Sequence, residues 1–348
     1  MSDFFKCNKS MNKVPLNPQE DYDFLVNKIG QIYTVAQRAA NQAISVELLK
    51  AYWYIGYYIV EFEQKGHIRA EYGKQLILTL AKDLTLRYGK GFSRTNLVYM
   101  RLFYIRYPNQ ETIFFQLTWS HYIEFLAIKD DLARSFYEKQ SILENWTIET
   151  LKRHKKTALF QRLALSKDKE GVLKLAKEGQ IIETPADIIR EPYILEFLKI
   201  PEHYAYSESE LEQRIIDELQ TFLLELGKGF AFVGRQYRVT LNNKHYHVDL
   251  VFYHIKLKCY VLIDLKLDNV EHYDIGQMNM YLGYFAKEVT EVTDNEPIGI
   301  ILSAEKDDVM VEYAMYKNNA QLFVAQYQLY LPDKATLEQR IKRILEKE

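Results

Sequence analysis

The chain has 348 residues, 48% of them hydrophobic, and its formal net charge at pH 7 is −2. This is the composition of a globular protein long enough for two domains, and it excludes a basic surface that covers the whole chain. No stretch of 18 apolar residues occurs and the N-terminus has no signal-peptide core, so we expect a cytoplasmic protein. The two cysteines, Cys7 and Cys259, argue against a disulfide framework and fit a reducing compartment.

Helical spacing of apolar residues dominates the first half of the chain. We expect a flexible tail over residues 1–17 and an all-helical N-terminal domain over 18–165. The mixed segment 166–205, which contains prolines, is expected to link this domain to the next. The clearest predicted helices of the first domain are 47–64, 74–89 and 93–108.

This helical region has a local excess of basic residues. Between Ile68 and Pro108 there are eight Lys or Arg residues and two Asp or Glu residues. The helix that ends near Arg87, the turn YGKGF and the helix capped by Ser93 resemble a helix-turn-helix pair that binds DNA or a partner. The alternative is a plain helical hairpin with a solvated basic face. The candidate DNA contacts, by their affinity for phosphates and for guanine or adenine edges, are Lys90, Arg94, Asn96 and Arg101.

From about residue 206 the apolar period changes from that of helices to that of strands. The second domain is expected over 206–332, and it begins with one amphipathic helix that ends at Gly227. Asn242-Asn243 predicts a hairpin between the first two strands. The element order is α-β-β-β-α-β, an α+β or α/β fold, and 333–348 are expected to form a C-terminal helix.

Charged residues interrupt two apolar strands of this domain. In CYVLIDLKLDN, Asp264 and Lys266 project from the same face of the strand, about 7 Å apart. Asp249 interrupts HVDLVFY on the neighbouring strand in the same way. On the preceding helix, Glu212 begins the apolar stripe instead of facing water. A half-buried acid needs a partner, a metal or a shifted pKa, so these four residues are the candidate catalytic site.

Two aspartates and a glutamate, with a lysine beside them at one edge of a sheet, provide the hard oxygen ligands that Mg²⁺ prefers. A bound cation could lower the pKa of a water molecule and stabilise charge on a phosphodiester. Because the four contain no histidine or cysteine, a structural zinc site fits poorly. His245 and His247 alternate with Asp249 on one strand. Two interpretations are open: both are exposed hairpin histidines, or His247, on the same face as Asp249, lies near the metal.

Asp249 and the run Asp264-Leu265-Lys266, on strands after a helix that bears Glu212, resemble the core of the PD-(D/E)XK nucleases. Val248 stands where that motif has its proline.

The following helix supplies a second similarity. Gln277 and Tyr281, at positions i and i+4, resemble the QxxxY element of the RecB-like and lambda-exonuclease-like branches. Over the whole chain, segments such as GFSRTNLVYMRLFYIRYP, LTWSHYIEFL and LLELGKGFAFVGRQYRV resemble the bacterial YhcG-type family of PDDEXK nuclease domain-containing proteins, which have a helical N-terminal region. This similarity runs from about residue 30 to about residue 335.

The resemblance implies a restriction-endonuclease-like fold and a hydrolase, a Mg²⁺- or Mn²⁺-dependent deoxyribonuclease, that acts in defence, restriction or DNA processing. The metal ligands it implies are Asp249, Asp264, the backbone carbonyl of Leu265 and Glu212, the last through a second metal or a metal-bound water. Lys266 would orient the attacking water. Gln277 and Tyr281 would contact the nucleic-acid backbone near the cut.

The resemblance also suggests partners. Duplex cutting in this superfamily often uses paired subunits, which suggests a homodimer, and association with restriction-modification or other defence components is expected. The alternative function is a catalytically silent nucleic-acid-binding or assembly protein that retains the nuclease fold. A nuclease directed at RNA is a further alternative.

Overall fold

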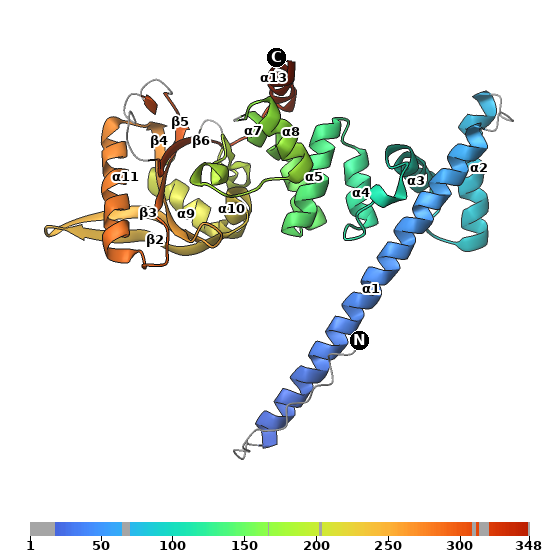
Figure 1. Cartoon of the computed structure of the whole chain (residues 1–348), viewed down its shortest axis with the longest axis horizontal. Helices are drawn as coiled ribbons and strands as arrows, with labels where there is room; N and C mark the ends of the chain where they lie inside the picture. The colour runs from blue at the N-terminus through green and yellow to red at the C-terminus, as the bar shows by residue number, and fades with distance from the viewer. Residues whose placement is uncertain are drawn as a thin grey trace. The chain divides into compact units, whose positions relative to one another are not determined.

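The computed structural model of the protein describes residues 18–64, 70–165, 167–201, 204–307, 311–312 and 320–346 (Figure 1). The tail predicted over residues 1–17 lies outside them. The chain forms two compact units, Met1–Leu126 and Ala127–Glu348, and each is described by itself. None of the described helices combines the length and the apolar character that a membrane span requires.

The described part of the first unit is helical. Its elements are α1 (Pro18–Gln64), α2 (Ala70–Tyr88), α3 (Arg94–Arg106), the 3-10 turn η1 (Gln110–Thr112) and α4 (Trp119–Leu126). Helix α1 begins far earlier than the predicted helix 47–64. Helix α3 begins after Ser93, as predicted, and the Ser93 hydroxyl accepts a hydrogen bond from the backbone amide of Asn96 at 3.2 Å.

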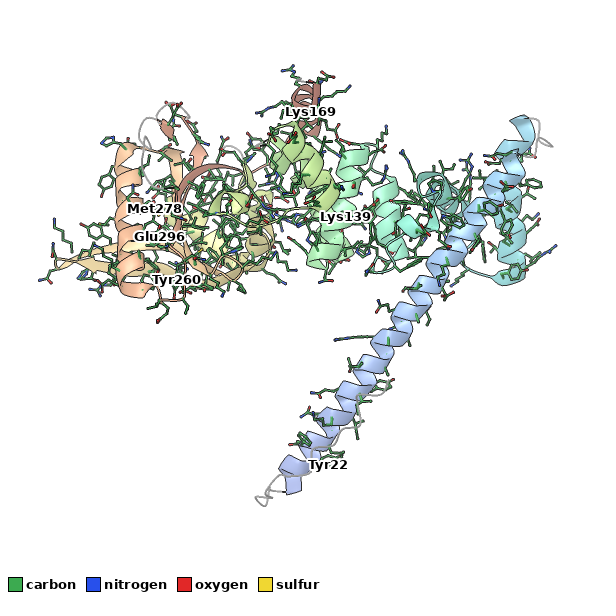
Figure 2. All side chains as sticks on the ribbon, viewed as in Figure 1. Tyr22, Lys139, Lys169, Tyr260, Met278 and Glu296 are labelled. Atoms are coloured by element: carbon green, nitrogen blue, oxygen red, sulfur yellow. The ribbon has the colours of Figure 1, made fainter. Side chains whose placement is uncertain are left out.

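Helices α1, α2 and α3 share one apolar core. Its buried members are Ile59, Ile77, Leu97 and Met100. Gly56 of α1 lies against α3, where a Cβ atom would collide with the backbone carbonyl oxygen of Met100. The side chains of residues 22–44, by contrast, are all exposed, as the sticks along the first half of α1 show (Figure 2).

The second unit begins with more helices. They are α5 (Asp131–Glu144), α6 (Ile148–Lys156), α7 (Leu159–Leu165) and α8 (Lys169–Glu178). The segment predicted to be a linker, 166–205, includes α8, two 3-10 turns, η2 (Pro185–Ile188) and η3 (Glu196–Leu198), and a short strand, β1 (Tyr193–Ile194). The predicted linker thus already contributes a strand to the sheet, and the domain boundaries stay a prediction.

The sheet of the second unit has six strands among the described residues, in the order β1-β6-β5-β4-β3-β2. The elements described from α9 onward are α9 (Glu208–Asp217), α10 (Leu219–Leu226), β2 (Phe230–Leu241), β3 (Lys244–His254), β4 (Cys259–Asn269), α11 (His272–Tyr284), the short π-helix η4 (Phe285–Val289), β5 (Ile298–Glu305), β6 (Leu322–Gln328) and α13 (Lys334–Glu346). Strands β2, β3 and β4 are antiparallel, and β4, β5, β6 and β1 are parallel. The predicted order α-β-β-β-α-β is confirmed.

Helices cover both faces of this sheet. Residues Leu211, Ile215, Phe222 and Leu226 of α9 and α10 pack on the face formed by Leu250, Phe252, Val261, Ile263 and Leu265. Residues Ile275, Met278, Tyr281 and Leu282 of α11 pack on the opposite face, formed by Val248, Val251, Leu262 and Ile301. The apolar run of β4 is therefore buried on both sides, as expected for a central strand.

Local sequence signals place several of these boundaries. Asn242 and Asn243 both have positive φ and form the two-residue turn of the predicted hairpin, which Leu241 and Lys244 close. The single helix predicted up to Gly227 is wrong in one respect: it is divided into α9 and α10 at Glu218, whose backbone is no longer helical. Glycine ends α10 at the predicted position with a φ of 110°, a conformation that favours this residue.

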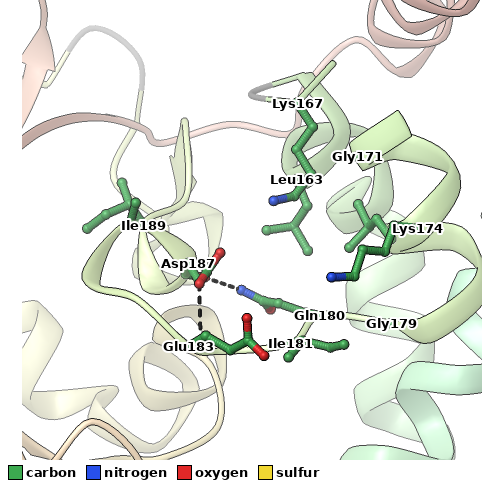
Figure 3. A pocket seen from close by; sticks show the side chains of 12 residues that line it. Leu163, Lys167, Gly171, Lys174, Gly179, Gln180, Ile181, Glu183, Asp187 and Ile189 are labelled. Carbon is green, nitrogen blue, oxygen red and sulfur yellow. Dashed lines mark hydrogen bonds between the residues drawn. The ribbon is translucent and has the colours of Figure 1, made fainter. Parts of the chain in front are cut away.

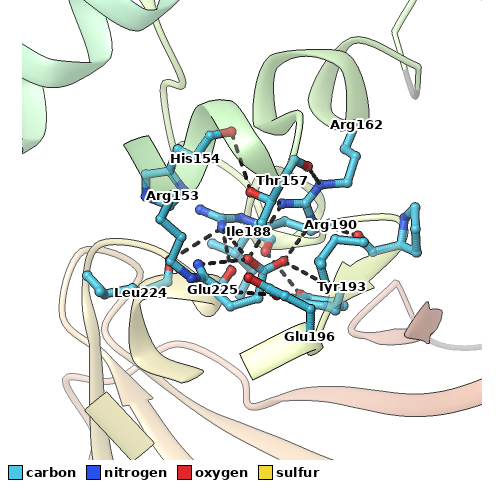
Figure 4. Close-up of polar contacts among 12 residues, drawn as sticks. Arg153, His154, Thr157, Arg162, Ile188, Arg190, Tyr193, Glu196, Leu224 and Glu225 are labelled. Atoms are coloured by element: carbon cyan, nitrogen blue, oxygen red, sulfur yellow. Dashed lines mark hydrogen bonds and ion pairs between the residues drawn. The ribbon is translucent and has the colours of Figure 1, made fainter. Parts of the chain in front are cut away.

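A buried carboxylate joins three arginines in the second unit (Figure 4). Oε1 of Glu225, on α10, lies 2.6 Å from Nη1 of Arg162 on α7 and accepts a 2.9 Å hydrogen bond from the amide of Ile194 in β1. Oε2 of Glu225 lies 3.2 Å from Nη1 of Arg153 on α6 and 3.9 Å from Nη1 of Arg190. The cluster connects two helices that precede the sheet to the helical layer that covers it.

Candidate active site

Strands β3 and β4 separate where two aspartates lie side by side. The strands pair as far as Leu250 opposite Ile263, so the next residues in register are Asp249 and Asp264. Beyond this point a side chain replaces the backbone ladder: Oδ2 of Asp249 accepts a hydrogen bond of 2.8 Å from the amide of Leu265. Asp264 is 4% exposed and Asp249 is half-buried. The register of the sheet thus brings together two acids that the sequence predicts to act as a pair.

The ammonium group of Lys266 lies among three carboxylates. Its Nζ atom is 3.1 Å from Oδ2 of Asp264, 3.5 Å from Oδ1 of Asp274 and 3.9 Å from Oε1 of Glu208. The first contact is the one that the strand pattern predicts. The other two come from the first turns of α11 and α9 and were missed, because sequence gives the face of a helix but not which strand its end approaches.

Glu212 is buried, with 3% of its surface exposed, as its place in the apolar stripe predicts. Its Oε2 atom accepts a hydrogen bond of 2.6 Å from Nε2 of Gln236, which also lies 3.0 Å from Oδ1 of Asp249. Its Oε1 atom lies 3.0 Å from Nε of Arg235. Gln236 therefore bridges the glutamate of α9 to the aspartate of β3.

The sequence pattern does not predict the contacts of Gln236 and Arg235 with these acids. Both residues follow a register shift in β2 between Phe232 and Gly234, and Gln236 has a φ of 47°. This bulge directs their side chains toward the acids. The break from the apolar run 230–233 to Gly234-Arg235-Gln236 is the signal that could have identified it.

Burial and mutual repulsion shift the pKa values of these acids. Burial, followed by the nearby charge of Asp249, raises the pKa of Asp264 to about 7, although Lys266 opposes the shift. Burial also raises the pKa of Asp249, opposed by the hydrogen bonds from Leu265 and Gln236. Burial alone would lower the pKa of Lys266, but Asp264 outweighs it and the pKa lies above its ordinary value. The pair of aspartates is thus costly to ionise, and the lysine remains an ammonium.

The donor set fits a divalent cation in its chemistry. Asp249 and Asp264 are hard oxygen ligands whose repulsion a cation would relieve, and the Leu265 carbonyl is adjacent in sequence. Within the described residues, no three side chains of His, Cys, Asp or Glu are grouped closely enough to hold an ion as they stand. Glu212 in particular is engaged by Arg235 and Gln236. The four predicted metal ligands therefore stay a prediction.

The two residues of the predicted QxxxY element are in contact on α11. Nε2 of Gln277 donates to the hydroxyl of Tyr281, which in turn donates a 2.8 Å hydrogen bond to the backbone carbonyl of His247. Tyr281 has no exposed surface, whereas Gln277 is half-buried. Tyr281 is thus placed to orient Gln277, and the predicted contact of both residues with nucleic acid stays a prediction.

Three of the four residues predicted to bind DNA, Lys90, Arg94 and Asn96, lie at the turn between α2 and α3 or at the start of α3. Lys90 and Arg94 are exposed there. The side-chain amide of Asn96 donates through Nδ2 to the carbonyl of Gly91 at 2.6 Å and accepts through Oδ1 from Nε1 of Trp119 at 2.9 Å. These two bonds stabilise the turn.

Arg101 is engaged within the same unit. Its Nε atom lies 2.7 Å and 2.9 Å from the two carboxylate oxygens of Glu63, on α1. Any contact of Arg101 with a phosphate would have to compete with this ion pair.

His245 and His247 of β3 are exposed, whereas His254, at the end of the same strand, is buried. Nε2 of His245 lies 2.7 Å from Nη2 of Arg238 across the hairpin. This agrees with the interpretation of His245 and His247 as exposed hairpin histidines.

A separate cavity opens between α7, α8 and the segment 179–189 (Figure 3). Lys167, Lys174, Gln180 and Asp187 line it, and Gln180 donates a hydrogen bond of 2.6 Å to the backbone carbonyl of Asp187. None of the acids around Lys266 contributes to its wall.

Comparisons with known proteins match two family models to this chain. The model described as the YhcG PDDEXK nuclease domain matches residues 186–342, and the DUF1016 N-terminal domain matches residues 28–162. The chain is 36% identical over 357 residues to a protein of Escherichia coli (strain K12) named "Putative nuclease YhcG", and the alignment covers 93% of this chain and 94% of that protein.

Two solved structures are also similar to part of the chain. They are a repair endonuclease from Pyrococcus abyssi, with 18% identity and a TM-score of 0.26, and EndoMS in its apo form, with 15% identity and a TM-score of 0.25. Each similarity covers 38% of this chain, and the chain spans about half the length of those proteins, 50% and 49%.

Proposed function

The chain belongs to the YhcG family of PDDEXK nuclease-domain proteins, and from this premise we propose that it hydrolyses phosphodiester bonds in DNA with a divalent cation, Mg²⁺ or Mn²⁺. The observation that carries the proposal is the meeting of Asp249, Asp264 and Lys266 where β3 and β4 separate. A buried and a half-buried acid that repel each other are costly to a fold, and such groups gather at sites of chemistry.

Three oxygen donors would hold the cation in this proposal: the carboxylates of Asp249 and Asp264 and the carbonyl of Leu265. When bound there, the cation would make water more acidic and stabilise negative charge on the phosphodiester. Glu212 would serve a second cation, directly or through water, after exchanging its contact with Arg235, now 3.0 Å away. The two aspartates would hold the cation at the point where β3 and β4 separate.

Lys266 would contribute charge and hydrogen bonds and would not act as a base. Since Asp264 keeps its pKa above the ordinary value, the side chain is an ammonium at neutral pH and can only donate hydrogen bonds. From its place 3.1 Å from Asp264 it can orient an attacking water molecule and offset charge on the phosphate.

Two surfaces would contact DNA away from the acids. Gln277, oriented by Tyr281, would contact the backbone near the cut. In the first unit, Lys90 and Arg94 would bind phosphates and base edges through the helix-turn-helix pair. Asn96 and Arg101 would join them only by exchanging their present partners, so we expect them to contribute less.

The setting that we propose is bacterial DNA defence, restriction or DNA processing. Restriction-modification or other defence components are the partners that fit such a role, and duplex cutting would favour a homodimer. The competing function is a catalytically silent DNA-binding or assembly protein. The completeness of the set Glu212, Asp249, Asp264 and Lys266 favours the enzyme, because a silent module has no need for costly buried acids.

The test is a cleavage assay with Mg²⁺ on single-stranded, duplex and branched DNA, and on RNA, for the purified full chain. Wild type is expected to cut DNA, with EDTA abolishing the activity and Asp264→Asn lowering it at least 10²-fold. Asp217→Asn, on the exposed side of α9, is the matched control and should cut like wild type.

Each other outcome has a definite meaning. Equal cutting by wild type and Asp264→Asn would remove the proposed site. Tight DNA binding without cleavage of any substrate would favour the silent module, and preferential cutting of RNA would replace DNA as the substrate.

A further inference from the structure

The first half of α1 exposes an apolar seam. Residues 22–44 are all exposed, although Tyr22, Leu25, Ile29 and Ile32 are large apolar residues, with 61%, 53%, 57% and 70% of their surface exposed. They follow one another at steps of three and four, and Ala36, Ala39 and Ala43 continue the series. This is a heptad pattern sustained over three repeats, the period at which helices wind around one another.

Charge on this segment is scarce. From Phe24 to Val46 there are two basic residues, Lys28 and Arg38, and no acidic residue. A helix that stays alone in water is usually polar and charged on most of its surface. The composition indicates a helix that is covered by another apolar helix.

The distribution of side-chain size along the seam indicates which helix could cover it. The first half of the seam is bulky and the second half is alanine. If a second copy of α1 runs antiparallel about a twofold axis near residue 34, Leu25 meets Ala43, Ile29 meets Ala39 and Ile32 meets Ala36. Each layer then pairs a large with a small side chain, and an a position with a d position, as antiparallel coiled coils require.

The flanking positions agree with this register. Tyr33 and Val35 lie near the twofold axis and meet their own counterparts, and Lys28 lies opposite Gln42, so no like charges meet. A parallel pair would instead stack alanine on alanine in one half and bulky residues in the other. The seam from Tyr22 to Ala43 would bury roughly 600–700 Å² per copy, which reaches the lower end of stable protein interfaces.

We propose that residues 22–43 of α1 form an antiparallel two-stranded coiled coil with the same residues of a second copy of this chain. The proposal is independent of the nuclease assignment. It assigns the self-association of the protein to one helix of the first unit and gives it a register.

The first experiment measures the mass of the full chain by light scattering over a range of concentrations. Wild type is expected to be a dimer, and Ile29→Glu with Ile32→Glu is expected to weaken dimerisation more than 100-fold. Asn27→Glu with Thr34→Glu, which adds the same charge on the opposite side of the helix, should leave the dimer intact. A monomeric wild type, or a dimer that survives the seam variant, would overturn the proposal.

A second experiment tests the direction of the helices. In a Cys7→Ser background, Leu25→Cys and Ala43→Cys proteins are treated with a short bismaleimide, alone and as a mixture. The antiparallel register places residue 25 beside residue 43 of the other copy and about 27 Å from its own counterpart along the axis. We expect cross-linking only in the mixture; cross-linking of Leu25→Cys alone would indicate a parallel pair and contradict the register. Buried Cys259 is expected to remain unreactive.

Discussion

The carboxylate of Asp249 is bonded to the backbone of the strand that carries its partner acid: its Oδ2 atom accepts a 2.8 Å hydrogen bond from the amide of Leu265. This bond takes the place of a ladder bond at the point where β3 and β4 separate. Asp249 therefore has two roles: its hydrogen bond connects β3 to β4 where the strands separate, and its carboxylate supplies negative charge to the site. Substitutions can separate the two roles.

Asp249→Asn should keep the hydrogen bond from Leu265 and lose the cleavage activity. An asparagine oxygen can still accept from Leu265, although its NH2 group then faces Nε2 of Gln236 and that hydrogen bond is lost. Because the substitution also removes the repulsion with Asp264, we expect a melting temperature within about 2 °C of wild type and a loss of cleavage of at least about 10²-fold. Asp249→Ala leaves the amide without its acceptor and should cost about 1–3 kcal/mol as well. Thermal unfolding and single-turnover cleavage measure the two effects; wild-type cleavage by Asp249→Asn would exclude a catalytic role.

Lys266→Gln tests whether the ammonium charge matters. It removes the cation that lowers the pKa of Asp264, so that pKa should rise further, and cleavage should fall by about 10²–10⁴-fold. Carboxyl-labelled NMR would follow the titration of Asp264. Lys306→Gln removes a lysine that pairs with Glu191 at 2.9 Å, and it should change neither quantity. A titration of Asp264 unaffected by Lys266→Gln would contradict the described contact.

The raised pKa of Asp264 makes a prediction about stability and pH. The folded-state pKa of about 7 lies above the ordinary aspartate value, so ionising this residue opposes folding. The stability that the protonated form retains at low pH is lost as pH rises from about 4 through about 7. In EDTA, Asp264→Asn should therefore gain stability over wild type by about 1–3 kcal/mol more at pH 8 than at pH 5. Denaturant unfolding at the two pH values measures this, with Asp217→Asn as control; a gain equal at both would refute the shift.

Tyr281 and Gln277 should separate into a positioning residue and a contact residue. Tyr281→Phe removes a buried hydroxyl that bonds His247 and Gln277, so we expect a loss of about 1–2 kcal/mol in unfolding free energy. Gln277→Ala should leave stability within about 0.5 kcal/mol of wild type but weaken DNA binding in the presence of Ca²⁺. Equal DNA affinities of wild type and Gln277→Ala would exclude the predicted contact.

Glu225 should be among the most sensitive positions for stability. Burial alone would raise its pKa, but Arg162, Arg190 and Arg153 outweigh burial and lower it. Glu225→Gln leaves the arginines without their counter-charge and is expected to cost about 3–5 kcal/mol. In wild type this contribution is present above the ordinary glutamate pKa and is lost as pH falls through the lowered folded-state value. Glu210→Gln, in a surface pair with Arg214, should change stability by less than about 0.5 kcal/mol when both are compared by denaturant unfolding.

Sequence alone could predict the strands that carry Asp249, Asp264 and Lys266, because strand alternation fixes which side chains share a face. It could also predict the buried face of Glu212, since helical periodicity is local. It could not predict that Glu208 and Asp274 approach Lys266, because that depends on where two helix ends meet the sheet. The bridge made by Gln236 depends on a bulge, which changes the alternation that the prediction assumes.

The sequence predicts neither the full length of the first helix nor the buried ion cluster, and the reasons are related. Apolar spacing predicts a single long helix over 47–64, the part of α1 that shares a core with α2 and α3, whereas the exposed part lacks the charged face of an ordinary surface helix. Glu225 lies in a segment that was treated as one continuous helix. The division of that helix at Glu218 is set by tertiary packing, which local propensity does not record.

The arginines around Glu225 also limit which fragments of this protein can fold on their own. Arg153 and Arg162 belong to the segment 28–162 and Glu225 to the segment 186–342, which match different family models. A fragment that starts at residue 186 would bury the glutamate without two of its three cations. Nor could an unrelated helical segment be grafted onto the sheet unless it brought equivalent arginines. We therefore expect the segments 28–162 and 186–342 to be inherited together, because the ion pairs of Glu225 join them.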